Sequence, residues 1–148
     1  MAARKQFISI DFSDFSDYAD EMEKLNMDIK EIFGKAMEKA ARTVQEDTLS
    51  ALDNQYLPAR GIYSKGTTKQ QVIPPESART KWEGPFGEVK LGFDKSKPGA
   101  GGYLITGTPK MQPDYELQKI YGQKRYERDL RKQIEEDLQR EIDRRLGR

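Results

Sequence analysis

The longest regular pattern in the chain runs over residues 27–52, where apolar residues recur at the spacing of one helix face. Charged residues such as Lys30, Glu31 and Lys39 occupy the opposite side. Alanine is frequent on the apolar face, and its small side chain lets another layer approach closely. We therefore expect a long amphipathic helix with a sheet packed across it. The apolar face comprises Ile29, Ile32, Phe33, Ala36, Met37, Ala40, Ala41, Val44, Ala51 and Leu52.

Two segments alternate between apolar and polar residues, as strands with one buried face do. They are residues 7–12 and residues 88–93. The second is expected to form a hairpin with residues 78–83 through a Gly-Pro turn, and the single tryptophan, Trp82, is expected to pack in that hairpin. The short apolar segment 103–106 can add an edge strand. Together these elements predict an α+β fold in which the long helix packs on a small antiparallel sheet.

Start and stop signals for helices lie between these elements. Ser13 and Asp14 are good capping residues for a short first helix, and Asn26 marks a bend before the long helix. Two prolines make residues 107–113 a rigid turn, and Asp114 can cap the helix that follows.

Two stretches are rich in glycine and proline and lack apolar anchors, namely residues 56–75 and residues 94–102. Loops of such length are commonly functional or poorly ordered. We expect both to be irregular, and to be mobile in the isolated subunit.

The C-terminal segment is predicted to form a highly charged helix with an apolar residue at every fourth position. Four residues turn a helix by about 400°, so this stripe drifts by about 40° at each step, and one flat partner surface cannot cover it. The pattern predicts a core domain over residues 1–121 and an extended helical arm over residues 122–148. The core is expected to cover only the near end of the stripe, so that Leu138, Ile142 and Leu146 are buried by another chain.

Composition narrows the classes of function. The 148 residues include 26 basic and 25 acidic side chains, and the net charge of +1 gives no global attraction to nucleic acid or membrane. The chain has no cysteine and no histidine, which excludes disulfides and removes the commonest general base and metal ligand. We expect a non-enzymatic protein without a catalytic residue, a cofactor or a metal site. No run resembles a signal peptide or a membrane span, so a soluble cytosolic product is expected.

Two charged clusters invite a functional interpretation. Residues 135–137 are all acidic and could bind a hard cation, but consecutive helical residues point in different directions, which favours a solvated face. Lys95, Lys97 and Lys110 could form a basic rim or line a channel for DNA. Aromatic residues that would stack on bases are not interleaved with them, which favours a solvated surface over specific recognition of nucleic acid.

Residues 103–114, which read YLITGTPKMQPD, resemble a family of small tail-component proteins of long-tailed bacteriophages. These are head–tail joining, neck or tail-completion proteins. Their pattern is a long helix over the first third, a hairpin, an aromatic–aliphatic strand ending in Gly-Thr-x-x-Met, and a final helix after a proline. The similarity covers most of residues 7–121. The chain departs from the pattern just before the Gly-Thr pair, where Ile105 and Thr106 stand in place of an acidic residue.

The resemblance implies a structural virion protein of a tailed phage or prophage that forms a homo-oligomeric ring at the head–tail junction, as a neck, tail-completion or minor tail protein. Its partners would be copies of itself and neighbouring head-completion, connector or tail-tube proteins, with non-specific contact to packaged DNA left open. It would lie in the virion, and in the host cytoplasm during virus assembly.

Within such a ring, the segment 103–111 would meet the neighbouring subunit, and Gly107 would permit a backbone shape that a side chain forbids. The predicted subunit-interface residues are Tyr103, Ile105, Gly107, Thr108, Pro109, Met111, Leu138, Ile142 and Leu146. Two other classes stay open: a nucleic-acid-associated accessory protein that uses the basic loops, and a helical adaptor whose C-terminal helix docks into a partner.

Overall fold

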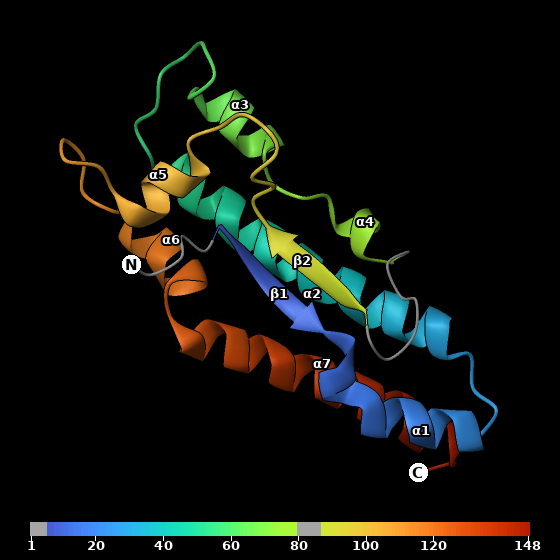
Figure 1. Cartoon of the computed structure of the whole chain (residues 1–148). Coiled ribbons are helices and arrows are strands. Elements are labelled where there is room, and N and C mark those ends of the chain that lie inside the picture. The colour runs from blue at the N-terminus through green and yellow to red at the C-terminus, as the bar shows by residue number, and fades with distance from the viewer. Residues whose placement is uncertain (1–5, 80–86) are drawn as a thin grey trace.

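The computed structural model describes residues 6–79 and 87–148 of the chain. A long helix and an antiparallel pair of strands form its centre, so the predicted α+β class is confirmed (Figure 1). In chain order the elements are β1 (Phe7–Asp11), the 3₁₀ helix η1 (Phe12–Phe15), α1 (Ser16–Lys24), α2 (Ile29–Asp53), α3 (Lys65–Gln70), α4 (Pro75–Arg79), β2 (Glu88–Gly92), α5 (Gly101–Thr106), α6 (Tyr115–Tyr121) and α7 (Lys124–Arg145).

The helix predicted over residues 27–52 is α2, and its apolar face is buried as predicted. Asn26 has a left-handed backbone with φ of 55°, which makes the predicted bend before it. The Asp28 carboxylate caps the helix by accepting a hydrogen bond from the Glu31 amide at 3.2 Å. The strands cross one side of α2, while α4, α6 and α7 contact it elsewhere (Figure 1). The apolar face of α2 therefore belongs to the same hydrophobic core as the side chains of the sheet and of α7.

The sheet joins the start of the chain to its middle. β1 pairs with β2 antiparallel, from Phe7 opposite Gly92 to Asp11 opposite Glu88. The predicted hairpin partner of β2 is wrong for residues 78–79, which belong to α4, while the rest of that partner, including Trp82, lies outside the described residues. Pro75 explains the start of α4, because proline fits the first turn of a helix.

The first helical turn begins two residues earlier than a cap at Ser13 would place it. Asp11, not Ser13 or Asp14, is the capping residue: its carboxylate accepts a hydrogen bond from the Ser13 amide at 2.9 Å and opens η1. The same hydrogen bond, together with one from the Ser13 hydroxyl, lowers the pKa of Asp11.

The two stretches predicted to be irregular contact each other through buried polar groups. The first contains α3, so the prediction of an irregular stretch is wrong for residues 65–70. The Thr68 hydroxyl accepts a hydrogen bond from the Ala100 amide at 3.0 Å, and the Gln71 side-chain oxygen accepts one from the Gly101 amide at 3.1 Å. These bonds between distant segments are a tertiary feature that local composition does not reveal.

The predicted edge strand at residues 103–106 is wrong, because these residues form most of α5. The Leu104 amide donates to the Ala100 carbonyl at 2.9 Å, in the i to i−4 pattern of a helix. A short apolar run does not distinguish a strand from a buried helix. The turn that follows is confirmed: Thr108 and Met111 pair across it, and Asp114 caps α6 by accepting from the Glu116 amide at 3.2 Å.

The apolar residues of α7 are covered by the chain itself, which corrects the prediction that another chain buries Leu138 and Ile142. Both are 0% exposed and belong to the same hydrophobic cluster as the side chains of α2 and the sheet. Leu146, at the end of the helix, is 42% exposed. We call the four buried residues of this helix the α7 stripe; they are Leu130, Ile134, Leu138 and Ile142.

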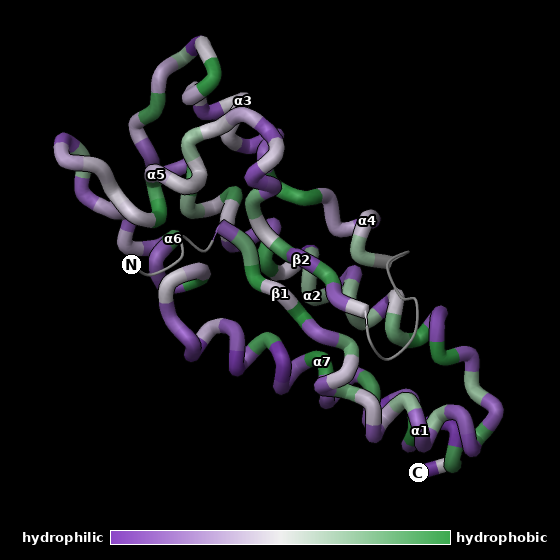
Figure 2. Tube along the Cα trace, viewed as in Figure 1, coloured by the Kyte–Doolittle hydropathy of each residue, from purple (hydrophilic) through white to green (hydrophobic). Residues whose placement is uncertain are grey.

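The drift of the α7 stripe is matched by a change of neighbour along the helix. α7 contacts α6, α2 and α1 in this chain (Figure 2), so different surfaces cover different steps of the stripe. Polar contacts flank it: Arg131 pairs with Asp14, and the Arg145 guanidinium donates to the Leu25 carbonyl at 3.3 Å. The expectation that one flat surface cannot cover the stripe is confirmed, and the several surfaces that cover it belong to the same chain.

Two tyrosines near the junction of α6 and α7 bind α2. The hydroxyls of Tyr121 and Thr48 lie 2.6 Å apart in the core, and the Tyr126 hydroxyl donates to the Asp47 carboxylate at 2.6 Å. Burial raises the pKa of both tyrosines, and the Asp47 carboxylate raises that of Tyr126 further. Both hydroxyls therefore stay protonated at neutral pH.

Candidate interaction surface

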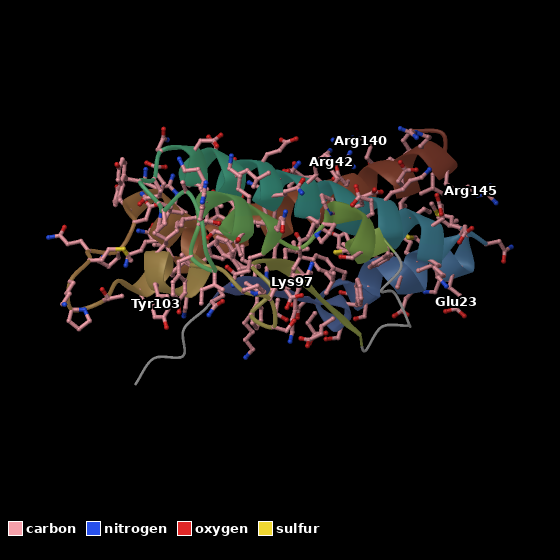
Figure 3. The ribbon with its side chains drawn as sticks, turned by 90° about the horizontal axis from the view of Figure 1, so that it is seen from above. Glu23, Arg42, Lys97, Tyr103, Arg140 and Arg145 are labelled. Carbon is pink, nitrogen blue, oxygen red and sulfur yellow. The ribbon has the colours of Figure 1, made fainter. Side chains whose placement is uncertain are left out.

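Exposed apolar side chains gather at one end of the molecule. Of the six large apolar residues that stand exposed in the described part of the chain, only Leu146 lies elsewhere. The other five lie on three segments that meet at one end: residues 54–64, α5 and the start of α6 (Figure 1). Figure 3 shows Tyr103 at this end, opposite Glu23 and Arg145. We call this surface the aromatic end; its exposed members are Tyr56, Ile62, Tyr63, Tyr103 and Tyr115.

The centre of the aromatic end is a pair of tyrosines beside a shallow groove. The rings of Tyr63 and Tyr103 meet edge to face, with centroids 5.6 Å apart and planes at 80°. A hydrogen bond with Tyr103 raises the pKa of Tyr63. The adjoining groove has a volume of about 370 Å³ and is lined by Tyr56, Leu57, Pro58, Tyr63, Ala100, Tyr103, Leu104, Thr108 and Met111. The surface thus offers apolar rings with polar edges.

Local capping holds the Tyr63 side of the groove. The Ser64 hydroxyl accepts a hydrogen bond from the Thr67 amide at 3.1 Å and starts α3 immediately after Tyr63. Lys69 pairs with Asp53 at 2.5 Å, and its hydrogen bond and charge lower the pKa of that carboxyl. The loop that carries Tyr63 is therefore attached to the C-terminal end of α2.

The Tyr103 side of the groove depends on the turn after α5. Gly107 has φ of 76°, and a Cβ there would lie 2.8 Å from Pro113 Cδ and 2.9 Å from the Met111 carbonyl oxygen. The prediction that Gly107 permits a backbone shape forbidden to other residues is confirmed. The Asp114 amide donates to the Leu104 carbonyl at 2.6 Å, which brings the start of α6 against α5. Burial, opposed by the hydrogen bond from the Glu116 amide, raises the pKa of Asp114.

The structure brings most of the predicted turn residues to the aromatic end. Tyr103 is 40% exposed, Thr108 and Pro109 are exposed, and Met111 is half-buried. The prediction that Ile105 lies at a subunit interface is wrong, because Ile105 is buried in the core and offers no surface to a partner. Sequence reasoning missed Tyr56, Ile62 and Tyr63, whose only signal is the presence of large apolar residues in a stretch without helix or strand periodicity.

The predicted basic rim is divided between two loops. Lys95 and Lys97 lie between β2 and α5, while Lys110 lies at the tip of the turn between α5 and α6. All three are exposed. Their role as a DNA-facing rim stays a prediction.

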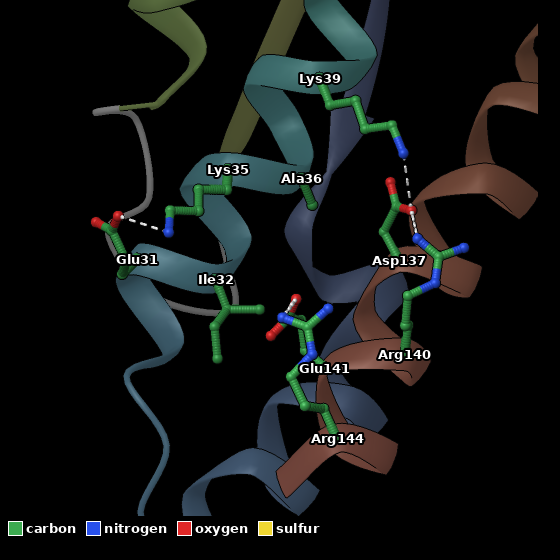
Figure 4. A pocket seen from close by; sticks show the side chains of 9 residues that line it. All are labelled: Glu31, Ile32, Lys35, Ala36, Lys39, Asp137, Arg140, Glu141 and Arg144. Carbon is green, nitrogen blue, oxygen red and sulfur yellow. Dashed lines mark hydrogen bonds and ion pairs between the residues drawn. The ribbon is translucent and has the colours of Figure 1, made fainter. Parts of the chain in front are cut away.

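A second groove, between α2 and α7, is lined by four cations and three carboxylates, and each of them belongs to an ion pair (Figure 4). Asp137 accepts from Lys39 at 3.1 Å and from Arg140 at 3.2 Å, so a member of the acidic cluster at residues 135–137 is held by cations. Arg144 pairs with Glu141 at 3.3 Å. With its charges already paired, this groove has little to offer an ionic ligand.

Residues 6–79 and 87–148 contain no group of three or more carboxylates that could hold a metal ion. None of the helices in this described part is both long and apolar enough to cross a membrane.

Comparisons of the chain with protein-family models, with curated proteins and with solved structures found no match.

Proposed function

We propose that this chain is a structural protein of a tailed-phage or prophage virion, which forms a ring of identical copies at the head–tail junction and has no enzymatic role. The observation that carries the proposal is the aromatic end, because Tyr103, Thr108 and Met111 of the phage-like segment lie beside its groove. Tyrosine and methionine are enriched at protein interfaces, and a gathered apolar patch marks an interaction site.

The position of the patch at one tip is compatible with a ring as well as with a simple pair. The molecule is elongated along α2, and the aromatic end occupies one tip (Figure 3). If that tip binds a different surface of the next copy, the contact is head-to-tail and closes into a ring when the rotation permits. The net charge of +1 creates little repulsion between copies.

Native mass spectrometry and negative-stain microscopy of the full chain test the proposal, with closed rings as the expected result. Tyr103→Ser should reduce ring formation by about tenfold or more, as expected for an aromatic anchor of an interface. Lys132→Ser is the control, since Lys132 is exposed near the middle of α7, away from the aromatic end. The control should assemble normally.

Three outcomes would contradict the proposal. A monomer at high concentration would leave the aromatic end without a self-contact. A discrete dimer would show that the tip binds itself. Salt-sensitive retention of DNA by a monomer would favour the nucleic-acid accessory class instead, because contacts to phosphates weaken as salt rises.

A further inference from the structure

The strand β1 has one open edge. The Phe12 amide donates to the Gly87 carbonyl at 2.8 Å, and the Phe93 amide donates to the Gln6 carbonyl at 2.8 Å. With the register fixed, even-numbered residues of β1 bond to β2, and the backbone groups of Phe7, Ser9 and Asp11 face away from it. The amides of these three residues and the carbonyls of Phe7 and Ser9 have no backbone partner among the described residues, whereas the Asp11 carbonyl, as the cap of η1, accepts the first hydrogen bond of that helix.

A groove runs beside this edge. It has a volume of about 710 Å³ and lies between the start of β1 and parts of α5, α6 and α7. Phe7, Ile8 and Ser9 line the strand side, and Ile105, Ile120 and Lys124 are among the residues opposite. In Figure 1 β1 lies between β2 and α7, so the open edge faces this groove.

The unpaired charge in the groove is positive. Lys95 and Lys124 line it, and neither has an ion pair to any described residue. The lining carboxylate, Glu127, is paired with Arg131 at 3.6 Å. Lys90 adds a cation nearby, with its Nζ 4.8 Å from the centroid of the Phe7 ring.

From this combination we propose that β1 accepts an extended, acidic segment of a partner protein as a third strand of the sheet. Main-chain hydrogen bonds to Phe7, Ser9 and Asp11 would supply binding, and acidic side chains would pair with Lys95 and Lys124. Segments 1–6 and 144–148 of a second copy fit poorly, because each carries basic residues and no acidic ones. This inference does not rest on the proposed virion role.

The test uses the full chain and two synthetic peptides, acetyl-Asp-Val-Thr-Val-Thr-Val-Asp-amide and its counterpart with lysine at both ends. In the free chain, amide NMR should show faster hydrogen exchange at Phe7, Ser9 and Asp11 than at Ile8 and Ile10. The acidic peptide should shift the three edge amides and slow their exchange by about tenfold or more. The lysine peptide should bind about tenfold more weakly or worse.

Two variants separate the backbone contribution from the charge contribution. Ser9→Pro removes an outward-facing amide donor but no hydrogen bond between β1 and β2. It should therefore weaken binding of the acidic peptide by about tenfold. The double variant Lys95→Glu with Lys124→Glu should also weaken binding of the acidic peptide by about tenfold, without altering the backbone. If Ser9→Pro does not fold, this double variant alone tests the proposal. Lys97→Glu is the control, since Lys97 is exposed on the same loop but does not line the groove.

The proposal is overturned if the edge amides are already as protected as those of Ile8 and Ile10 in the free chain. It is also overturned if millimolar acidic peptide leaves those amides unchanged, if the lysine peptide binds equally well, or if Lys97→Glu weakens binding as much as the double charge reversal.

Discussion

The α7 stripe and the aromatic end differ in whether their apolar side chains are buried. The four leucine and isoleucine residues of the stripe are buried, although their helix is charged on every other face. The aromatic end keeps five large apolar side chains in solvent. A sparse apolar stripe on a charged helix therefore does not show that another protein must cover it. A long helix of the same chain can bury the stripe, as α2 does for α7.

The charged residues that flank the stripe play the smaller part in holding it. Ion pairs at the protein surface contribute about 0–1 kcal/mol each. The pairs of Lys39 and Arg140 with Asp137 have exposed cations and a carboxylate that is 14% exposed. Burial of one leucine or isoleucine side chain contributes about 1.5–3 kcal/mol. The attachment of α7 is therefore mainly apolar, and variants of the stripe test it most directly.

Deletion of residues 123–148 should have the largest effect. It removes the α7 stripe and uncovers the α2, α6 and α1 surfaces beneath it, so we expect a chain without a cooperative unfolding transition. Circular dichroism during urea titration measures this. A truncated chain that unfolds cooperatively, with stability close to that of the full chain, would restore the sequence-based view of a separate arm.

Truncation of a single stripe residue should come next. Leu138→Ala should lower the free energy of unfolding by about 2–5 kcal/mol, because Leu138 is fully buried and its removal leaves a cavity. Leu146→Ala is the control at the exposed end of the same helix and should cost under about 1 kcal/mol. Equal effects in urea titrations would mean that the far end of α7 is not packed as described.

The turn of the aromatic end should respond to a change at Gly107. Gly107→Val forces a β-branched residue into φ of 76° and against Pro113, which should cost about 1–3 kcal/mol of stability. Gly66→Ala is the control, because Gly66 lies in α3 with open space around its Cα. A Gly107→Val chain as stable as the control would show that the turn adapts.

The stability at alkaline pH should depend on the buried Tyr121 and not on the exposed Tyr115 of the aromatic end. Burial raises the pKa of Tyr121, whereas an unfolded tyrosine ionises near pH ~10. The protonated Tyr121 hydroxyl contributes fully to the stability of the folded chain below pH ~10. This contribution is lost as the pH rises from there toward the raised pKa of Tyr121 in the folded chain. The free energy of unfolding should fall by up to about 1.4 kcal/mol for each pH unit above that point.

Urea titrations across alkaline pH, with phenolate absorbance as a second signal, measure this slope. The double variant Tyr121→Phe with Thr48→Val should reduce the slope without removing it, because Tyr126, whose pKa is also raised, keeps its hydroxyl. The second substitution avoids leaving the Thr48 hydroxyl buried without a partner. Tyr115→Phe, at the aromatic end, should leave it unchanged. An unchanged slope in the double variant would assign the alkaline loss to other groups.

The sequence alone determined features that depend on a few neighbouring residues. The periodicity of α2, the cap at Asp114 and the bend at Asn26 follow from side-chain spacing and backbone preference within one or two helical turns. The turn at Gly107 follows in the same way, because its glycine and prolines restrict the backbone locally. The α+β class needed only the sum of such local patterns.

Only the tertiary structure decided which surfaces meet. Residues 103–106 are compatible with a strand or a helix, and they became α5 where Ala100 and Gly101 bond to Thr68 and Gln71. β2 took β1 as its partner across most of the chain. Leu138 and Ile142 were buried because α7 folds back along the core, while Tyr63 and Tyr103 stayed exposed because no described segment passes over them. Whether an apolar side chain is buried depends on where residues far apart in the sequence pass in the fold. Local sequence patterns do not contain that information.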